Sequence, residues 1–159
     1  MIKEDCLFCK IAKGEIHSAT VYEDSHFTVI LDVNPATKGH CLIIPKEHFD
    51  NIYDLDGETA GKLFALATCI ARAMRDALKC DGLNLVQNNG EIAGQTVNHF
   101  HLHLIPRFIV NQKLLQNKCF NLSIFSLFFL LTNRISKCPQ RFSQPKICPV
   151  RIYNWCCFF

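Results

Sequence analysis

Within residues 98–105, histidine alternates with apolar side chains from His99 to Leu104, and this run constrains the fold more than any other feature of the chain. A β-strand directs successive side chains to opposite faces of its sheet. We therefore expect His99, His101 and His103 on one face, and the apolar residues between them in the core. Three imidazoles at this spacing are too regular for an ordinary polar strand face. The run thus predicts a functional site on a strand.

Two kinds of chemistry fit three neighbouring imidazoles. They can bind a transition metal, or one neutral imidazole can act as a nucleophile while the others donate hydrogen bonds to an anion. The preceding loop, residues 88–96, offers two glycine backbones, carboxamides and a hydroxyl. Taken alone, this loop would be an ordinary hairpin turn. Beside the histidines it favours phosphoryl transfer, because small neutral donors bind phosphate oxygens and are poor partners for a catalytic zinc ion.

The chain up to residue 107 predicts five short strands and two helices. The strands are expected, from their β-branched and aromatic content and their flanking breakers, at residues 21–23, 27–31, 40–44, 83–88 and 98–105. A short helix is predicted over residues 5–14, and an amphipathic one over residues 58–78. Strands and helices do not alternate regularly. The predicted fold class is therefore α+β, with a five-stranded antiparallel meander sheet, one long helix and one short helix.

The composition changes abruptly after residue 108. Residues 1–108 hold 10 Lys and Arg against 14 Asp and Glu, a net charge of −4, whereas residues 109–159 hold 7 Lys and Arg and no acid, a net charge of +7. We expect a domain at 1–108 and an atypical basic tail, rich in Phe and Cys and poorly structured, at 109–159. The tail is either a non-native continuation, such as a shifted reading frame, or a divergent extension that packs on the domain.

Composition also excludes several classes of protein. The acidic 1–108 region lacks the basic face that nucleic acid requires, so no nucleic-acid partner is expected. No run reaches the roughly 18 apolar residues that span a bilayer, and no membrane partner is expected. The first residues carry two acids and lead into no apolar run, which argues against a secretory signal. We therefore expect a cytoplasmic protein whose ten cysteines are reduced thiols or metal ligands.

Several segments resemble the histidine triad superfamily. Residues 99–105 match its defining motif, His-φ-His-φ-His-φ-φ, in which φ is an apolar residue. Residues 5–11 resemble the N-terminal segment of that family, and residues 31–35 and 38–48 resemble its central block, in the same order. Because its N-terminal segment contains cysteines, the chain is similar to the bacterial branch of nucleotide-binding histidine triad hydrolases.

The resemblance implies a reaction. Such a protein is a hydrolase or transferase that cleaves at the α-phosphate of a purine nucleoside phosphoramidate or a dinucleoside polyphosphate. It does so through a covalent nucleotidyl-histidine, releases a nucleoside monophosphate and needs no organic cofactor. It also forms a homodimer with the long helix at the interface. The alternative is a non-catalytic nucleotide-binding or scaffold protein of the same fold; the intact motif residues favour the enzyme.

The resemblance further implies roles for individual residues. His101 matches the nucleophile, His103 a donor to the phosphate oxygens, and His40 a buried histidine behind the triad. Asp32 matches the carboxylate that binds the ribose hydroxyls. The other matches are polar contacts to the phosphate and leaving group, namely Asn88, Gly94, Gln95 and Thr96, and apolar walls around the base, namely Phe8, Ile11, Ile16, Ile30 and Leu42. The predicted catalytic set is His40, His99, His101 and His103.

A second constellation combines Cys6-x-x-Cys9 with His48 and His99. Two thiolates and two imidazoles are the donors of a tetrahedral structural zinc site. The simpler interpretation of the two cysteines is a pair of half-buried thiols on a short helix. The resemblance favours zinc, because the bacterial branch has metal ligands at these positions. We therefore predict a structural zinc ion held by Cys6, Cys9, His48 and His99, which leaves His101 and His103 to the phosphate.

Overall fold

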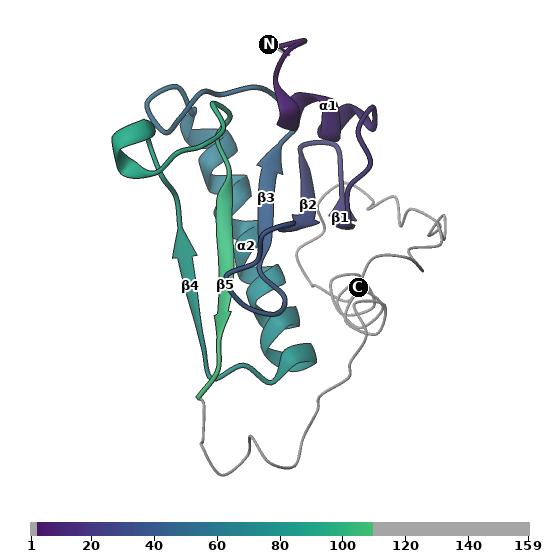
Figure 1. Ribbon diagram of the computed structural model, residues 1–159, viewed down its shortest axis with the longest axis vertical. Helices are drawn as coiled ribbons and strands as arrows, with labels where there is room; N and C mark the ends of the chain where they lie inside the picture. Colours follow the sequence, from purple (N-terminus) through teal and green to yellow (C-terminus); the bar gives the residue numbers. More distant parts are fainter. Residues whose placement is uncertain (1–2, 110–159) are drawn as a thin grey trace.

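The computed structural model describes residues 3–109 (Figure 1). Its elements, in chain order, are α1 (Leu7–Lys13), β1 (Thr20–Glu23), β2 (Phe27–Leu31), β3 (Cys41–Pro45), α2 (Gly57–Leu78), β4 (Gly82–Val86), the short 3-10 helix η1 (Glu91–Ala93) and β5 (Leu102–Arg107). Apart from Ile109, the predicted tail at 109–159 lies outside the described residues, so its expected lack of structure stays a prediction. Among the helices described, none has the length and apolar character needed to cross a membrane.

The five strands form one antiparallel sheet with the order β1-β2-β3-β5-β4. The α+β class, the five antiparallel strands and the long and short helices are confirmed. The meander is correct for β1, β2 and β3 but wrong for the last two strands, because β5 lies between β3 and β4. The helix α2 returns the chain to the end of the sheet where β3 began, so β4 runs in the same direction as β3. Placing β5 between them keeps every neighbouring pair antiparallel.

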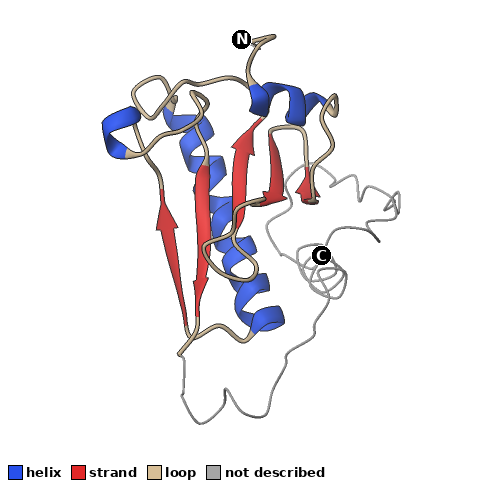
Figure 2. Cartoon of the chain, in the orientation of Figure 1, coloured by secondary structure: helices blue, strands red, loops and turns tan. Residues whose placement is uncertain are grey.

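One face of the sheet is covered by α2, as Figure 2 shows. This helix begins at the N-cap Asp56, whose side chain accepts a hydrogen bond from the Thr59 backbone N–H at 2.8 Å. Its apolar stripe at intervals of three and four residues is buried as the sequence predicts, at Leu63, Leu66, Ala67, Ile70, Ala73 and Met74. The stripe packs on apolar side chains from β2, β3 and β5, and together they form the main core.

The opposite face carries a second, smaller cluster beneath α1. Phe8 on α1 packs with Ile30 of β2 and with Leu42 and Ile44 of β3. The short helix begins at Leu7, two residues after its predicted start, and its N-cap Cys6 has no side-chain capping bond. It ends, as predicted, at Gly14, which adopts a left-handed conformation with φ of 78°. This face of the sheet, beside α1, is where the histidines gather.

Candidate functional site

The histidine run keeps its alternation although only its second half is a strand. The sequence predicts a strand from Asn98, but β5 begins at Leu102. The backbone N–H groups of the preceding residues form hydrogen bonds outside the sheet. The His99 N–H donates to the Val97 carbonyl at 2.8 Å, and the Phe100 N–H donates to the Phe49 carbonyl at 2.6 Å. Pro106 does not end the strand, which continues to Arg107.

The two faces of the run are separated as predicted. Phe100, Leu102 and Leu104 are buried in the main core against α2. The His101 and His103 rings lie together on the other side, with their centroids 4.9 Å apart. The Phe8 ring also contacts this side in a T-shaped arrangement, with its centroid 5.0 Å from that of His101.

The position of the proton on His101 follows from one contact. His101 Nδ1 lies 2.7 Å from the backbone oxygen of His99. A carbonyl oxygen can only accept, so Nδ1 carries the proton and donates it. Burial lowers the pKa of His101, which keeps the ring neutral at pH 7. The neutral ring therefore presents an unprotonated Nε2, the atom required of a nucleophile or a general base.

A chain of donors determines the proton positions on His40 and His103 in the same way. The Ala36 backbone N–H donates to His40 Nδ1 at 3.2 Å, so the proton of the neutral His40 ring is on Nε2. His40 Nε2 lies 2.9 Å from His103 Nδ1, which must accept. The proton of His103 is then on its Nε2. Burial lowers the pKa of both rings, that of His103 to about 4, so both are neutral at pH 7.

The two neutral rings thus have complementary functions: His101 presents a lone pair, and His103 presents an N–H donor. The carboxylate of Asp32 lies behind them, with one oxygen 3.5 Å from His40 Nδ1 and 3.9 Å from His103 Nδ1. The other oxygen accepts the Asn34 backbone N–H at 2.8 Å. This side of the site therefore holds a negative charge next to a row of neutral imidazoles.

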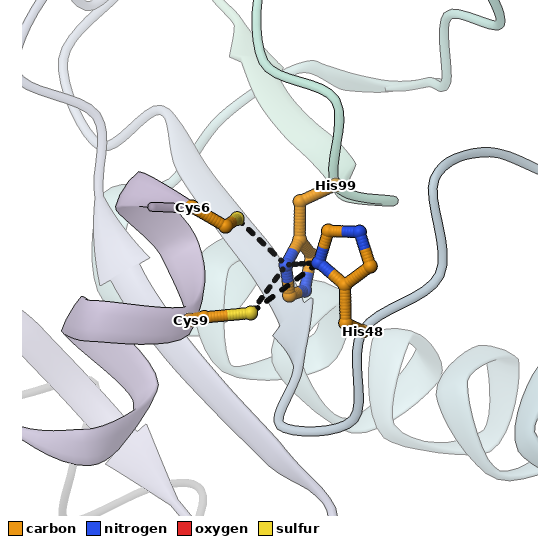
Figure 3. A group of neighbouring side chains, drawn as sticks. All are labelled: Cys6, Cys9, His48 and His99. Atoms are coloured by element: carbon orange, nitrogen blue, oxygen red, sulfur yellow. Dashed lines mark hydrogen bonds between the residues drawn. The ribbon is translucent and has the colours of Figure 1, made fainter. Parts of the chain in front are cut away.

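Cys6, Cys9, His48 and His99 converge on one point, as Figure 3 shows. Their ligand atoms all lie within 4.8 Å of one another. The Cys6 and Cys9 sulfurs are 3.4 Å and 3.6 Å from His99 Nδ1, and the Cys9 sulfur is 3.3 Å from His48 Nδ1. The two Nδ1 atoms are 3.1 Å apart. Ligands of a tetrahedral zinc ion, at about 2.0–2.1 Å for nitrogen and 2.3 Å for sulfur, have similar separations.

The far sides of the two imidazoles explain why both Nδ1 atoms can act as ligands. His99 Nε2 donates to the Pro45 carbonyl at 2.9 Å, and His48 Nε2 donates to the Asp50 carboxylate at 2.7 Å. The Nδ1 atom of each ring faces the cysteines, and it can bind a metal ion when the single proton of the ring is on Nε2. Burial lowers the pKa of His99 to about 4, which keeps the ring neutral. The donor set therefore fits a zinc ion.

The predicted phosphate loop has a more specific geometry than the sequence suggests. Gly90 and Gly94 both have positive φ, and the 3-10 turn η1 lies between them. Asn88 Nδ2 donates to the Gly94 carbonyl at 3.3 Å, and Thr96 is exposed. Gln95, by contrast, is only 5% exposed. Its side chain accepts from the Gly90 N–H and donates to the Asp50 and Val97 carbonyls.

Four of the five residues predicted to surround the base lie in one cluster. Phe8, Ile30 and Leu42 are buried together, and Ile11 packs against them. Ile16 is instead exposed. Sequence analysis missed Asp50, although it lies two residues after His48 and could have been considered as its partner. It also missed the Ala36 N–H and the His99 and Pro45 carbonyls, because backbone groups have no signal in the sequence.

The chain is similar in sequence and in fold to known proteins. Residues 13–110 match the HIT domain family. "Protein hit" of Bacillus subtilis is 51% identical over 105 residues, which are 66% of this chain and 72% of that protein. The adenosine 5'-monophosphoramidase HNT1 of Saccharomyces cerevisiae is 43% identical over 102 residues, 64% of this chain and 62% of that protein. A crystal structure of a Zn-bound histidine triad family protein from Mycobacterium smegmatis is similar with a TM-score of 0.71 and 36% identity, covering 82% of this chain and 93% of that one.

Proposed function

Because the chain belongs to the HIT domain family, we propose that it is a nucleotide hydrolase or transferase that cleaves at an α-phosphate. The observation that carries the proposal is the 2.7 Å hydrogen bond from His101 to the His99 carbonyl, which leaves His101 Nε2 unprotonated in a neutral ring. A similar protein, HNT1, is an adenosine 5'-monophosphoramidase. The alternative of a non-catalytic binding protein gives no reason for this arrangement of protons.

The reaction has two steps in which His101 forms and then loses a bond to phosphorus. In the first, its Nε2 attacks the α-phosphorus in line, a nitrogen–phosphorus bond forms, and the bond to the leaving group breaks; the leaving group keeps the bonding electron pair and takes up a proton from water. In the second, water attacks the nucleotidyl-histidine and gives up a proton to solvent, the nitrogen–phosphorus bond breaks, and the nucleoside monophosphate leaves with His101 restored as a neutral ring. The Nε2–H of His103 stabilises the equatorial oxygens, and the chain from Ala36 through His40 holds that donor in place.

The nucleoside lies, in this proposal, between Asp32 and the apolar cluster. The Asp32 carboxylate accepts hydrogen bonds from the ribose hydroxyls, as the family resemblance implies. Phe8, Ile11, Ile30 and Leu42 supply the apolar surface for a purine base. Asn88, Gly94 and Thr96 contact the phosphate or the leaving group from the loop. Cys6, Cys9, His48 and His99 hold a structural zinc ion, which supplies a fixed junction between α1 and the sheet.

Charge favours a phosphoramidate over a dinucleoside polyphosphate. Residues 80–106, which include the loop and the histidines, contain two acids and no Lys or Arg. Residues 47–61 contain five acids and no Lys or Arg, and Lys3, which reaches this segment, is paired with Asp50 at 2.6 Å. A polyphosphate leaving group carries several negative charges and would be repelled here, whereas an amine is neutral or positive.

The proposed enzyme is a homodimer. Among the described strands, β4 is an edge strand, and its Leu85 is 46% exposed. Phe64 on α2 is 53% exposed. An open strand edge and apolar side chains on a long helix are features that a second copy of the chain would cover.

The test is to incubate the full chain separately with adenosine phosphoramidate and diadenosine tetraphosphate and to measure AMP. We expect AMP from both, with at least tenfold higher kcat/KM for the phosphoramidate. Acid-free denaturation during turnover should trap a nucleotidyl group on the protein, located at His101 by mass spectrometry. If neither substrate yields AMP, the proposed activity is contradicted. A higher kcat/KM for the tetraphosphate contradicts the proposed leaving group.

A further inference from the structure

Gln95 does not have the surroundings of a substrate ligand. Its carboxamide makes three hydrogen bonds to the backbone: Oε1 accepts from the Gly90 N–H at 2.7 Å, and Nε2 donates to the Asp50 carbonyl at 2.6 Å and the Val97 carbonyl at 3.0 Å. Both protons of Nε2 are thereby used, and the residue is 5% exposed. A phosphate oxygen, which accepts hydrogen bonds, could bind this carboxamide only by displacing one of the two bonds that Nε2 donates.

The bonds of Gln95 instead join the phosphate loop to the metal cluster. Asp50, whose carbonyl accepts from Gln95, orients His48 through its carboxylate at 2.7 Å. His48 presents its Nδ1 to the point where Cys6, Cys9 and His99 converge. A second bond in the same place, from the Ile52 N–H to Asn89 Oδ1 at 2.8 Å, holds the same two segments together.

We propose that Gln95 is a positioning residue and that the His48–Asp50–Gln95 chain couples occupancy of the metal cluster to the geometry of the phosphate loop. A metal ion that fixes His48 also fixes Asp50, and through Gln95 it fixes the backbone of residues 90–97. The metal ion would then set nucleotide affinity in addition to stabilising the fold. This inference rests on the proposed function, because it requires the loop to bind nucleotide.

Coupling of this kind is reciprocal. If the bound metal favours the loop conformation that binds nucleotide, nucleotide must tighten metal binding by the same factor. The exposed carboxylate of Asp54 provides a matched control for Asp50, because it lies in the same segment.

The experiment measures the Kd of the full chain for zinc by chelator competition, with and without saturating AMP. We expect AMP to lower the Kd for zinc by at least about fivefold, and zinc to lower the Kd for AMP equally. Gln95→Met removes the hydrogen bonds between Asp50 and the loop, and Asp50→Ala removes the hydrogen bond between Asp50 and His48. Each variant should reduce the change in Kd to less than about twofold. Asp54→Ala should keep the full change.

A second measurement does not need the metal-free chain to stay folded. Cobalt loaded into the cluster should show visible absorption bands that shift as AMP is added, and these shifts should be lost in Gln95→Met. AMP binding without any shift, or with the same zinc Kd in its presence and absence, overturns the coupling but leaves the proposed function intact. Failure of AMP to bind the zinc-loaded chain overturns the proposed function and the coupling together.

Discussion

His101 depends on one backbone carbonyl for its reactive form. The bond to the His99 oxygen holds the proton on Nδ1, and burial keeps the ring neutral. The same residue, His99, turns its side chain toward the cysteines. A single residue therefore contributes its imidazole to the proposed metal cluster and its carbonyl to the proposed nucleophile.

Replacing His101 separates chemistry from binding. We expect His101→Ala to abolish turnover, because loss of a covalent nucleophile costs about 10⁶-fold in well-studied hydrolases. AMP binding should survive, since Asp32 and the apolar cluster remain. His26→Ala, which removes an exposed histidine, is the control. The measurements are AMP release and the Kd for AMP; turnover within about tenfold of the unaltered chain would contradict the assignment.

His103 should make stability depend on pH. Its pKa in the folded protein is lowered to about 4 by burial, whereas the unfolded chain takes up this proton near 6.5. Between these values only the unfolded state gains the proton, so the stabilising contribution is full above pH 6.5 and is lost as the pH falls toward 4. One group contributes at most about 1.4 kcal/mol per pH unit to the free energy of unfolding.

The check is urea unfolding at pH 7.5 and pH 5.0 for the unaltered chain and for His103→Gln. The unaltered chain should lose more stability over this interval than the variant does. His26→Gln should behave like the unaltered chain. Parallel losses in the unaltered chain and in His103→Gln would show that His103 is not held in its neutral form.

At the scale of elements, α1 has little to hold it except its apolar cluster and the cysteines at its start. The helix has seven residues and no side-chain cap, so it has little stability of its own. Phe8 packs under it, while Cys6 and Cys9 face His48 and His99 on the same side of the sheet. A zinc ion at this point would fasten α1 to segments about 40 and 90 residues further along the chain.

Removal of a zinc ligand should therefore loosen α1 first. We expect one zinc ion per chain and a Tm for Cys9→Ser lower by more than about 5 °C, the shift that roughly 1 kcal/mol produces in a domain of about 100 residues. Cys80→Ser changes a free, half-buried cysteine outside the cluster and should leave the Tm nearly unchanged. Protein purified without chelators that contains no zinc would contradict the metal site.

At the scale of the whole molecule, every helix and strand of the described residues lies before Phe108. The last strand, β5, ends at Arg107, and the Ile109 N–H donates to the Asp81 carboxylate at 2.7 Å. The 109–159 sequence carries seven basic residues, no acid, and an uncharged apolar run at 120–131. Such a run promotes aggregation.

Truncation tests whether the tail is needed. Residues 1–109 should give a higher yield of dissolved protein than 1–159 and should melt cooperatively, because the core lies within the shorter chain. The comparison uses the same expression conditions and measures yield and thermal melting. A short form that precipitates, or melts without cooperativity while the long form melts sharply, would show that the tail is a structural element of the domain.

The proposed dimer is a separate expectation at this scale. Sedimentation velocity of the full chain should give the mass of two copies. Phe64→Glu places a charge on the exposed face of α2 and should shift the population toward the monomer. Lys62→Glu changes the charge of the same helix two residues away and serves as the control. A monomer at micromolar concentration in the unaltered chain would contradict the dimer.

Some of this organisation was predictable because it depends on local periodicity. The alternation of residues 98–105 places the histidines opposite the core whether or not the segment is a regular strand, since both faces are set by the same period of two. The stripe of α2 and its cap at Asp56 are equally local. The motif at 99–105 also identifies the family, which the comparisons confirm.

Other features depended on contacts that no local pattern encodes. Strand order followed from the direction in which α2 returns the chain, and the chemistry of the histidines followed from carbonyls and N–H groups brought to them by distant segments. Gln95 is the clearest case: the sequence offers a carboxamide beside a phosphate loop, and only packing against Asp50 shows where its hydrogen bonds go. Residue type and spacing determine which groups are available, whereas tertiary structure decides which of their donors and acceptors are already occupied.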